Sequence, residues 1–433
     1  MKNIILFALL FALCPALFFA QIPDTLWTKT YGGADNDRGY SVKQTADGGF
    51  IIGGETNSFG ADHGYLIKTD QYGDTMWTRT YLSAINSVLQ TYDNGYIFAG
   101  TAGHIYIVRT DSLGDTLWTR LIIPSNYSSR AEEIQPTFDS CYIIVGTATD
   151  YIANDYFDET YLLKIDDDGD TLWTKKYGQL ACFGQSVQQT HDNGYIVAGR
   201  WLAGSYLMKT DSLGDSLWHK SHDSGWLFSV RETSGGGFVS AGRISYYYDI
   251  FIIKTDSLGD TLWTRRFGES TTHDVAYCIR ETPDVCYVIT GYTASYGAGG
   301  NDLYLIKIRD SGDTLWTRTF GGTESDIGYE FEITSDSGYI IVGYTASQGA
   351  GSADVWLIKI APDTFAVKEA KGNIITKQAS GASIIQGPLV LPENANCRIF
   401  DITGRTVVPD KIRPGVFFIE VDGKITRKVV KVR

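Results

Sequence analysis

Short runs of β-branched and aromatic residues, separated by turns rich in Asp and Gly, fill the chain from about residue 24 to residue 361. Their lengths and turn punctuation are typical of strands rather than helices. A tryptophan phrase, in forms such as GDTLWT, recurs at intervals of 50, 41, 55, 45, 45 and 53 residues. Its tryptophans are Trp27, Trp77, Trp118, Trp173, Trp218, Trp263 and Trp316. An internal repeat of this period predicts a repeat architecture.

Two further phrases recur between the tryptophans. The first, with sequences such as SVKQTADGGFIIGG, begins at Ser41, Ser87, Glu133, Ser186, Ser229, Cys278 and Glu330. The second, with sequences such as YLIKTD, begins at Tyr65, Ile105, Tyr161, Tyr206, Phe251, Tyr304 and Trp356. Each unit therefore holds four strands joined by tight turns. Units of this kind are the sequence sign of propeller blades, so we predict an all-β, seven-bladed β-propeller with four-stranded blades.

The ends of the repeat indicate how the ring closes. The first tryptophan phrase, within residues 24–30, precedes any complete unit, and the last unit has three strands and no full phrase after it. We expect the N-terminal strand to complete the last blade, which would remove two exposed sheet edges. The alternative outer strand is residues 363–368, where Asp363, Thr364 and Phe365 echo the phrase faintly.

The repeated residues have a structural interpretation first. On the outermost strand, Trp and Leu alternate in direction, and both faces of a blade pack on neighbours, so each is expected to be buried between sheets. A sugar-stacking role for the tryptophans is the functional alternative. The turn T-x-D-x-G, complete at Thr45, Thr91, Thr190 and Thr334, resembles the Asp-box hairpin of sialidases and other propellers. That resemblance concerns a turn in which Asp caps backbone N–H groups, and it does not imply hydrolysis.

Candidate chemistry is sparse. The acidic run Asp166–Asp170 allows a calcium interpretation, but equivalent hairpins have fewer carboxylates, which favours a plain turn. His219 and His222 are three apart, a spacing that puts them on opposite faces of a strand. No HExxH, GxSxG or P-loop occurs, and the cysteines form no CxxC pair and are interpreted as core residues. We therefore assign no catalytic residue, no metal ligand and no cofactor.

The N-terminus predicts export. Lys2 precedes an almost wholly apolar run, Ile4–Ala20, which is typical of a secretory signal peptide cleaved after residue 20. No later segment is long and apolar enough to span a membrane. Removal of Lys2 lowers the net charge from −13 to −14, which argues against nucleic acid as a partner. We expect a secreted or outer-surface protein, monomeric, whose ligand is a glycan or a surface protein.

The composition changes after about Pro362. From Leu391 onward nine Lys/Arg face five Asp/Glu, a net of +4, and runs at Cys397–Ile402, Val416–Val421 and Lys424–Val432 predict a small β-sandwich. FDITGR, PGVFFIEVDGK and the basic end KVVKVR resemble the type A C-terminal sorting domain of type IX secretion substrates. The resemblance implies that the type IX secretion machinery is a partner of this domain and exports the protein across the outer membrane. The Pro-Asn-Pro opening frequent in that family is missing.

These observations divide the chain into a signal peptide (1–20), a propeller (21–361), a linker (362–372) and a sorting domain (373–433). The repeats are similar to QTSDGGYIIAG…GDTLWT arrays of bacterial and archaeal surface proteins, a resemblance that brings no known activity. The variable loops, at residues 31–40, 147–160, 292–302 and 344–354, should share one face of the disc. We expect a binding or adhesion protein that uses this face. The alternative is a secreted glycan-active enzyme, a hydrolase or lyase, with its site at one mouth of the channel.

Overall fold

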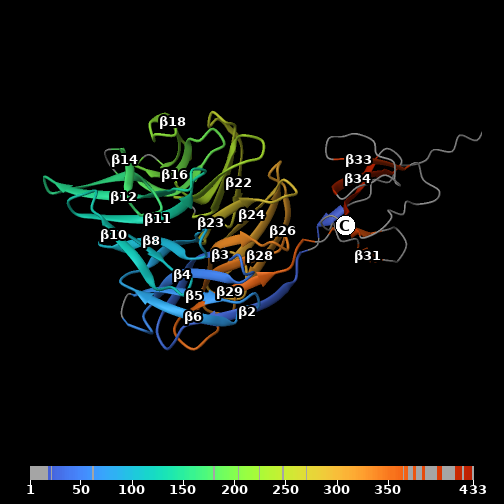
Figure 1. Ribbon diagram of the computed structural model, residues 1–433, viewed down its shortest axis with the longest axis horizontal. Coiled ribbons are helices and arrows are strands. Elements are labelled where there is room, and N and C mark those ends of the chain that lie inside the picture. Colours follow the sequence, from blue (N-terminus) through green and yellow to red (C-terminus); the bar gives the residue numbers. More distant parts are fainter. Residues whose placement is uncertain are drawn as a thin grey trace, which may run out of the picture. The chain divides into compact units, whose positions relative to one another are not determined.

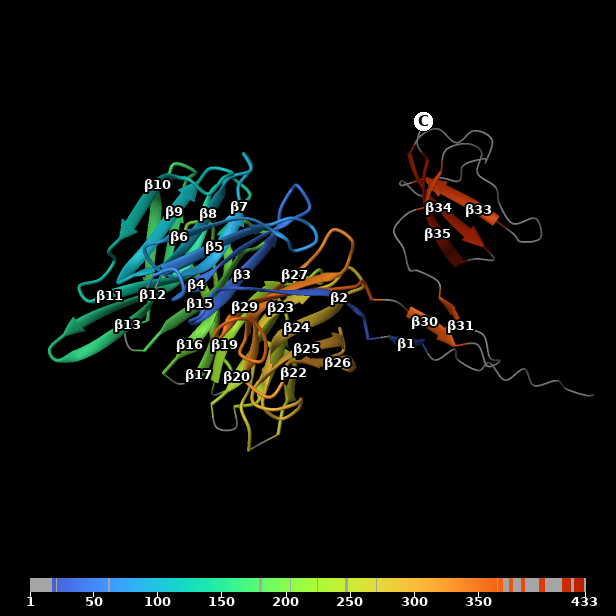
Figure 2. The ribbon, with the colours of Figure 1, turned by 90° about the horizontal axis from the view of Figure 1, so that it is seen from below.

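The structure, a computed structural model, describes residues 18–20, 22–60, 63–178, 181–202, 204–223, 225–245, 248–269 and 271–363, together with short strands between 365 and 431 (Figures 1 and 2). It divides into one compact unit of residues 22–363 and a second unit that combines residues 1–21 with 364–433. Each unit is described by itself.

The larger unit consists of seven antiparallel four-stranded sheets, the blades, arranged as a propeller. The innermost strands are β3 (Asp37–Gln44), β7 (Ile85–Gln90), β11 (Ser128–Pro136), β15 (Phe183–Gln189), β19 (Gly225–Glu232), β23 (Asp274–Glu281) and β27 (Asp326–Ile333). The second strands are β4 (Phe50–Thr56), β8 (Tyr96–Ala102), β12 (Tyr142–Ile152), β16 (Tyr195–Trp201), β20 (Phe238–Ile244), β24 (Cys286–Thr293) and β28 (Tyr339–Thr345). The third strands are β5 (His63–Thr69), β9 (His104–Thr110), β13 (Asp155–Ile165), β17 (Gly204–Thr210), β21 (Ile250–Thr255), β25 (Asp302–Arg309) and β29 (Asp354–Ile360). The outermost strands are β6 (Thr75–Tyr81), β10 (Thr116–Ile122), β14 (Thr171–Tyr177), β18 (Ser216–Ser221), β22 (Thr261–Phe267), β26 (Thr314–Phe320) and β2 (Thr25–Tyr31).

The N-terminal strand closes the ring. β2 pairs antiparallel with β29, with Thr28 opposite Ile358, and so supplies the outer strand of blade 7. This confirms the predicted seven-bladed fold and its closure. The alternative was wrong: β30 (Phe365–Lys368) pairs with β1 (Phe18–Ala20) and β31 (Ile374–Thr376) in a separate sheet. A full tryptophan phrase at residues 24–30 outcompetes the faint echo because it brings the packing residues that the blade needs.

The hydrophobic core lies between blades rather than at one centre. The second and third strands are buried on both faces, which explains their near-continuous apolar sequences. One cluster joins blades 2 and 3 through residues such as Ile107 and Ile144, and another joins blades 7 and 1 through Val342 and Ile52. Adjacent blades therefore stabilise one another by burying a shared apolar layer.

The repeated tryptophan packs on the following blade. A Cβ atom on Gly73 would lie 2.8 Å from the Trp27 ring, and one on Gly169 would lie 2.7 Å from the Trp118 ring, so only glycine permits these contacts. The apolar residue before the tryptophan differs from expectation in six of the seven phrases, where it is exposed. Leu117 is 59% exposed and Leu262 is 58% exposed, because the outermost strand has a neighbouring sheet on one face only. The prediction that both residues are buried was wrong for leucine.

The T-x-D-x-G turn covers a buried cation of the third strand. Asp47 accepts hydrogen bonds from Thr45 and the Gly49 N–H, and it forms an ion pair with Lys68, whose side chain is 3% exposed. Blade 5 lacks the aspartate, since Gly235 takes its place, and Lys254 instead pairs with Asp310 of blade 6. The repeated Lys or Arg therefore always has a carboxylate, which a buried cation requires.

The second unit contains a four-stranded sheet in the order β32 (Ser383–Ile385), β35 (Lys424–Lys431), β34 (Gly415–Val421) and β33 (Cys397–Asp401). Its last three strands match the strands predicted from the sequence. Most other residues after 363 lie outside the described residues, including those of FDITGR beyond Asp401. The first seventeen residues of the predicted signal peptide do so as well.

Candidate functional site

Every innermost strand carries a β-bulge, and the seven bulges shape the central channel. In each of these strands the pairing register skips one residue, which is the extra residue of the bulge. The skipped residue lies between Gly39 and Ser41 in β3 and between Ala276 and Cys278 in β23. A bulge adds one residue and re-aims side chains. The seven extra residues line the hollow of the channel, and we call them the mouth ring: Tyr40, Asn86, Glu132, Gln185, Phe228, Tyr277 and Tyr329. The residues that follow them form the waist ring: Ser41, Ser87, Glu133, Ser186, Ser229, Cys278 and Glu330.

The waist ring satisfies the backbone of the bulges. Ser41 Oγ accepts the Val88 N–H at 3.1 Å, and Ser186 Oγ accepts the Val230 N–H at 3.1 Å, each from the next blade. A bulge leaves an N–H without a partner in its own ladder, and leaving it buried and unpaired would be costly. The recurring Ser in the phrase SVKQT is therefore explained by the architecture.

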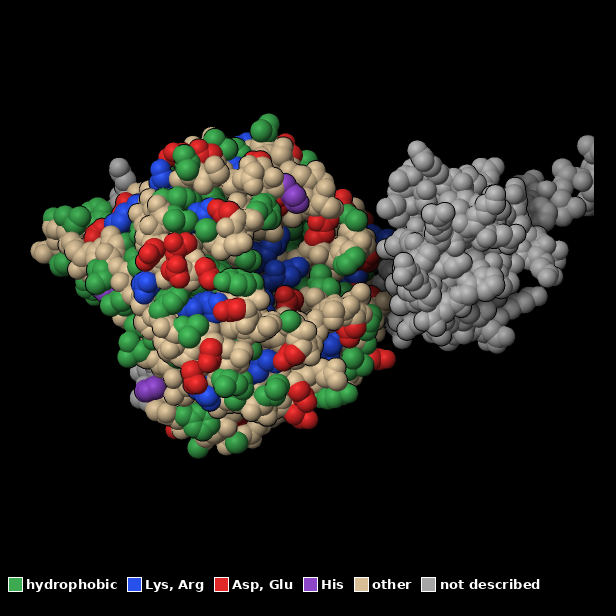
Figure 3. All heavy atoms as spheres, viewed as in Figure 1, with side chains coloured by type: hydrophobic (Ala, Val, Ile, Leu, Met, Phe, Trp, Pro, Cys, Tyr) green, Lys and Arg blue, Asp and Glu red, His purple; other side chains and the backbone are tan. Residues whose placement is uncertain are grey.

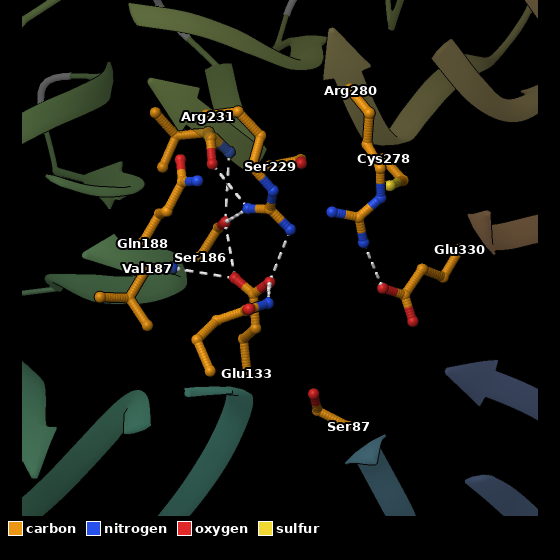
Figure 4. Close-up of polar contacts among 12 residues, drawn as sticks. Ser87, Glu133, Ser186, Val187, Gln188, Ser229, Arg231, Cys278, Arg280 and Glu330 are labelled. Atoms are coloured by element: carbon orange, nitrogen blue, oxygen red, sulfur yellow. Dashed lines mark hydrogen bonds and ion pairs between the residues drawn. The ribbon is translucent and has the colours of Figure 1, made fainter. Parts of the chain in front are cut away.

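Glu133 and Glu330 occupy the same ring position and join three blades each. Glu133 accepts hydrogen bonds from Ser186 and the Val187 N–H and pairs with Arg231 at 2.7 Å (Figure 4). Burial opposes its ionisation, but Arg231 and these donors prevail and hold the pKa of Glu133 below its ordinary value.

Glu330 does the same across the seam where the ring closes. It pairs with Lys43 of blade 1 and, at 2.7 Å, with Arg280 of blade 6, and it accepts the Val42 N–H. Burial opposes ionisation here too, yet Lys43 and Arg280 lower the pKa of Glu330 to about 2. Both carboxylates are saturated with structural donors.

Arg231 and Arg280 reach into the channel from neighbouring blades (Figure 4). Blue Lys and Arg side chains lie at the bottom of the central hollow in the face that Figure 3 shows. Three acids, Glu232, Glu281 and Glu332, line the same end of the channel and accept backbone N–H groups of His191, Ser234 and Gln44. This end, which lies on the side of the T-x-D-x-G turns, therefore carries both positive and negative groups.

The opposite end, on the side of the variable loops, is asymmetric. Four consecutive blades place aromatic rings in the mouth ring. The centroid of Phe228 lies 5.3 Å from that of Tyr277, which is 5.0 Å from Tyr329, which in turn is 5.1 Å from Tyr40. We call these four the aromatic arc. Their side chains are partly exposed, and burial raises the pKa of Tyr40, Tyr277 and Tyr329 well above the ordinary value.

The other three blades place hydrogen-bonding groups in the same ring. This polar arc comprises Asn86, Glu132 and Gln185. Burial raises the pKa of Glu132, which pairs with Arg130 and interacts with Gln185. The hollow between the arcs has room for about 100 Å³, so it admits only a small group. A larger ligand would rest on the mouth and insert one substituent.

The residues singled out from the sequence lie elsewhere. Asp166 caps the Asp170 N–H, and Asp167 contacts Arg109 and Tyr142, so this run forms a turn. His219 packs edge-on against Trp201, whereas His222 approaches Thr261. The described part of the chain contains no group of three or more potential ligands that could hold a metal ion. Burial lowers the pKa of both histidines, which fits packed side chains.

Sequence reasoning missed the mouth ring. Its members immediately precede the repeated phrase, and five residue types occupy their seven positions, whereas the phrase itself is more nearly uniform. That variation was visible, but the period-2 pattern assigned them no face because the bulge was not anticipated. Of the predicted variable loops, residues 147–160 are mostly strand, since β12 and β13 extend to a tight turn at Ala153 and Asn154.

The enzyme alternative gains no support from the two adjacent carboxylates of blade 3. Glu132 and Glu133 have pKa values shifted in opposite directions, as acid and base pairs often do. Glu133, however, already accepts hydrogen bonds from Ser186, Val187 and Gln135. It also forms an ion pair with Arg231. A general base must have a carboxylate lone pair that is free to accept a proton from the substrate. The lone pairs of Glu133 are already occupied by donors of the protein itself.

No protein-family model matches the chain, and no curated protein matches it. Among solved structures, the WD40 β-propeller domain of Doa1 is similar at a TM-score of 0.50 and 14% identity, over 77% of this chain and 95% of that one. This supports the propeller fold alone. BamB from Moraxella catarrhalis (TM-score 0.48, 9% identity, 78% and 100% covered) also matches. So does a protein of unknown function from Bacteroides caccae (0.42, 14%, 68% and 98%).

The described residues include no helix that is long and apolar enough to cross a membrane.

Proposed function

We propose that this chain is a binding protein whose ligand site is the mouth ring on the loop side of the channel. The observation that carries the proposal is the division of this ring into an aromatic arc and a polar arc. Aromatic rings contribute binding energy through their apolar faces, and Asn, Gln and Glu fix orientation by hydrogen bonds. A ring that served only the fold would be expected to repeat, as the tryptophans do.

We further propose that the protein works outside the cell, as a monomer. The apolar segment after Lys2 supports export, and FDITGR with the basic C-terminus supports passage through a type IX secretion machinery. Ligands that such a protein meets are glycans and surface proteins. The test of the export route is fractionation of cells expressing the chain with and without residues 373–433.

Binding at the mouth is tested with residues 21–433 against a panel of oligosaccharides and surface proteins. Tyr277→Ala together with Tyr329→Ala should weaken binding of the identified ligand at least about tenfold. Tyr72→Ala is the matched control, because Tyr72 is 62% exposed and lies on an outer turn. A ligand that binds the double tyrosine variant as tightly as the Tyr72→Ala control would overturn the proposed site. Turnover of a saccharide in the same assays would instead revive the enzyme alternative.

A further inference from the structure

Four arginines surround the loop-side mouth, and two of them differ from the others. Arg38 pairs with Glu55 and Arg130 pairs with Glu132. Arg200 and Arg243 have neither an ion pair nor a hydrogen bond to any residue that the structure describes. These two lie on neighbouring blades, at the loop-side ends of β16 and β20.

Both arginines contact aromatic rings instead. Arg200 lies over Trp226, with its guanidinium carbon 4.7 Å from the ring centroid, and 5.9 Å from that of Phe183. Arg243 is the cross-strand partner of Trp226 and lies 4.8 Å above the ring of Tyr248. Trp226 therefore connects the two cations, and we call Arg200, Trp226 and Arg243 the basic strip.

The basic strip continues into the mouth ring. Trp226 stacks on Phe228 of the aromatic arc, with centroids 5.8 Å apart and planes 18° apart. It also stacks on Phe183, at 5.6 Å and 25°. A ligand that covers the aromatic arc would thus reach both guanidinium groups without leaving the loop-side surface.

An arginine held against an aromatic face keeps its N–H donors at its edge. Those donors form a planar fork that matches a carboxylate or a sulfate, and partial burial strengthens the charge-assisted bonds. Other arginines of the propeller have carboxylate partners, as Arg38, Arg109 and Arg231 do. Two that have only ring contacts among the described residues, beside a candidate ligand site, are poised for an anionic group from outside.

We infer that the ligand of the mouth is an acidic saccharide, with a sugar ring on the aromatic arc and its carboxylate or sulfate on Arg200 and Arg243. This inference rests on the proposed function and specifies its ligand. The polar arc provides hydrogen-bonding groups for hydroxyls, and the small hollow admits one substituent of a sugar ring. The net charge of −13 disfavours nucleic acid as the ligand, and a short acidic saccharide brings far fewer charges.

The test compares three probes of similar length on residues 21–433: an oligogalacturonate, a sulfated oligogalactan and a neutral oligogalactan. We expect at least one acidic probe to bind about tenfold or more tightly than the neutral one, with affinity falling as salt rises. Arg200→Gln with Arg243→Gln should remove this preference, so that the acidic and neutral probes bind this variant with similar affinity. The acidic probe that binds more tightly identifies carboxylate or sulfate as the recognised group.

Arg79→Gln is the matched control, because Arg79 also lies over a tryptophan, Trp77, at 5.6 Å, but on the outer circumference. Equal binding of acidic and neutral probes, or a preference untouched by the double Arg variant, would overturn the inference and leave the proposed mouth site standing. If no saccharide binds but a surface protein does so through Tyr277 and Tyr329, the inference also fails. Failure of every ligand to depend on Tyr277 and Tyr329 would overturn the proposed function itself. Thermal unfolding of each variant separates lost binding from lost folding.

Discussion

The circumference and the channel mouth of this propeller are built from the same seven repeats, but they follow opposite rules. On the circumference, five of the seven repeated tryptophans pack on a glycine of the next blade, and cations such as Lys29 pair with the neighbouring turn. At the mouth, seven equivalent positions hold Tyr, Asn, Glu, Gln, Phe, Tyr and Tyr. Within one chain, repetition thus identifies residues that serve the blade, whereas the divergent mouth residues are those that we propose for ligand binding.

The waist ring lies between these extremes, and its exceptions test the rule most severely. Glu330 differs from the usual serine yet binds blades 6, 7 and 1 together. Glu330→Ala should destabilise the propeller by about 3 kcal/mol, because it leaves the partly buried Lys43 and Arg280 without their shared carboxylate. Urea unfolding measures this loss. A change below about 1 kcal/mol would show that this divergent waist residue is not structural.

Acid should weaken the same contact. The pKa of Glu330 is lowered to about 2 in the folded protein from an ordinary value of 4.5, so its stabilisation is complete above about pH 4.5. It is lost as the pH falls through 2. Burial raises the pKa of Asp302, whose protonation acts in the opposite direction and offsets part of this loss. Between pH 5 and 2, the free energy of unfolding should fall less steeply with decreasing pH for Glu330→Gln than for the natural chain.

Two adjacent residues of the tryptophan phrase, one packed and one exposed, should differ in their effect on stability. Trp118→Ala should cost about 2 kcal/mol, because the half-buried ring covers Gly169 of the next blade. Leu117→Ala should change stability by less than about 0.5 kcal/mol, since its side chain is largely in solvent. Neither change should alter ligand binding at the mouth. Equal losses for the two variants would contradict the inward and outward directions of these side chains.

The smallest effect is expected in the turn of blade 5. Gly235→Asp would restore T-x-D-x-G there, and a Cβ at this position meets only Thr233, at 3.8 Å. The new carboxylate can accept the Gly237 N–H, as Asp47 accepts that of Gly49. We expect a gain of about 0.5 kcal/mol in thermal or urea unfolding, limited because Lys254 already pairs with Asp310. A loss of stability would show that blade 5 has adapted to lack the aspartate.

The amino-acid sequence by itself determined the number of blades, the strands within them and the closure by residues 24–30. It could do so because these features rest on local pattern and on residues repeated in every unit. It also explained the tight turns, through Asp and Gly at fixed offsets.

The tertiary structure alone decided what meets at the channel. Bulges turn Tyr40, Tyr277 and Tyr329 toward one axis, and residues far apart in the chain, such as Glu133 and Arg231, become partners there. Which leucines are exposed was likewise decided by the presence or absence of a neighbouring sheet. Contacts between blades depend on the geometry of the closed ring, and no periodicity within a single blade encodes them.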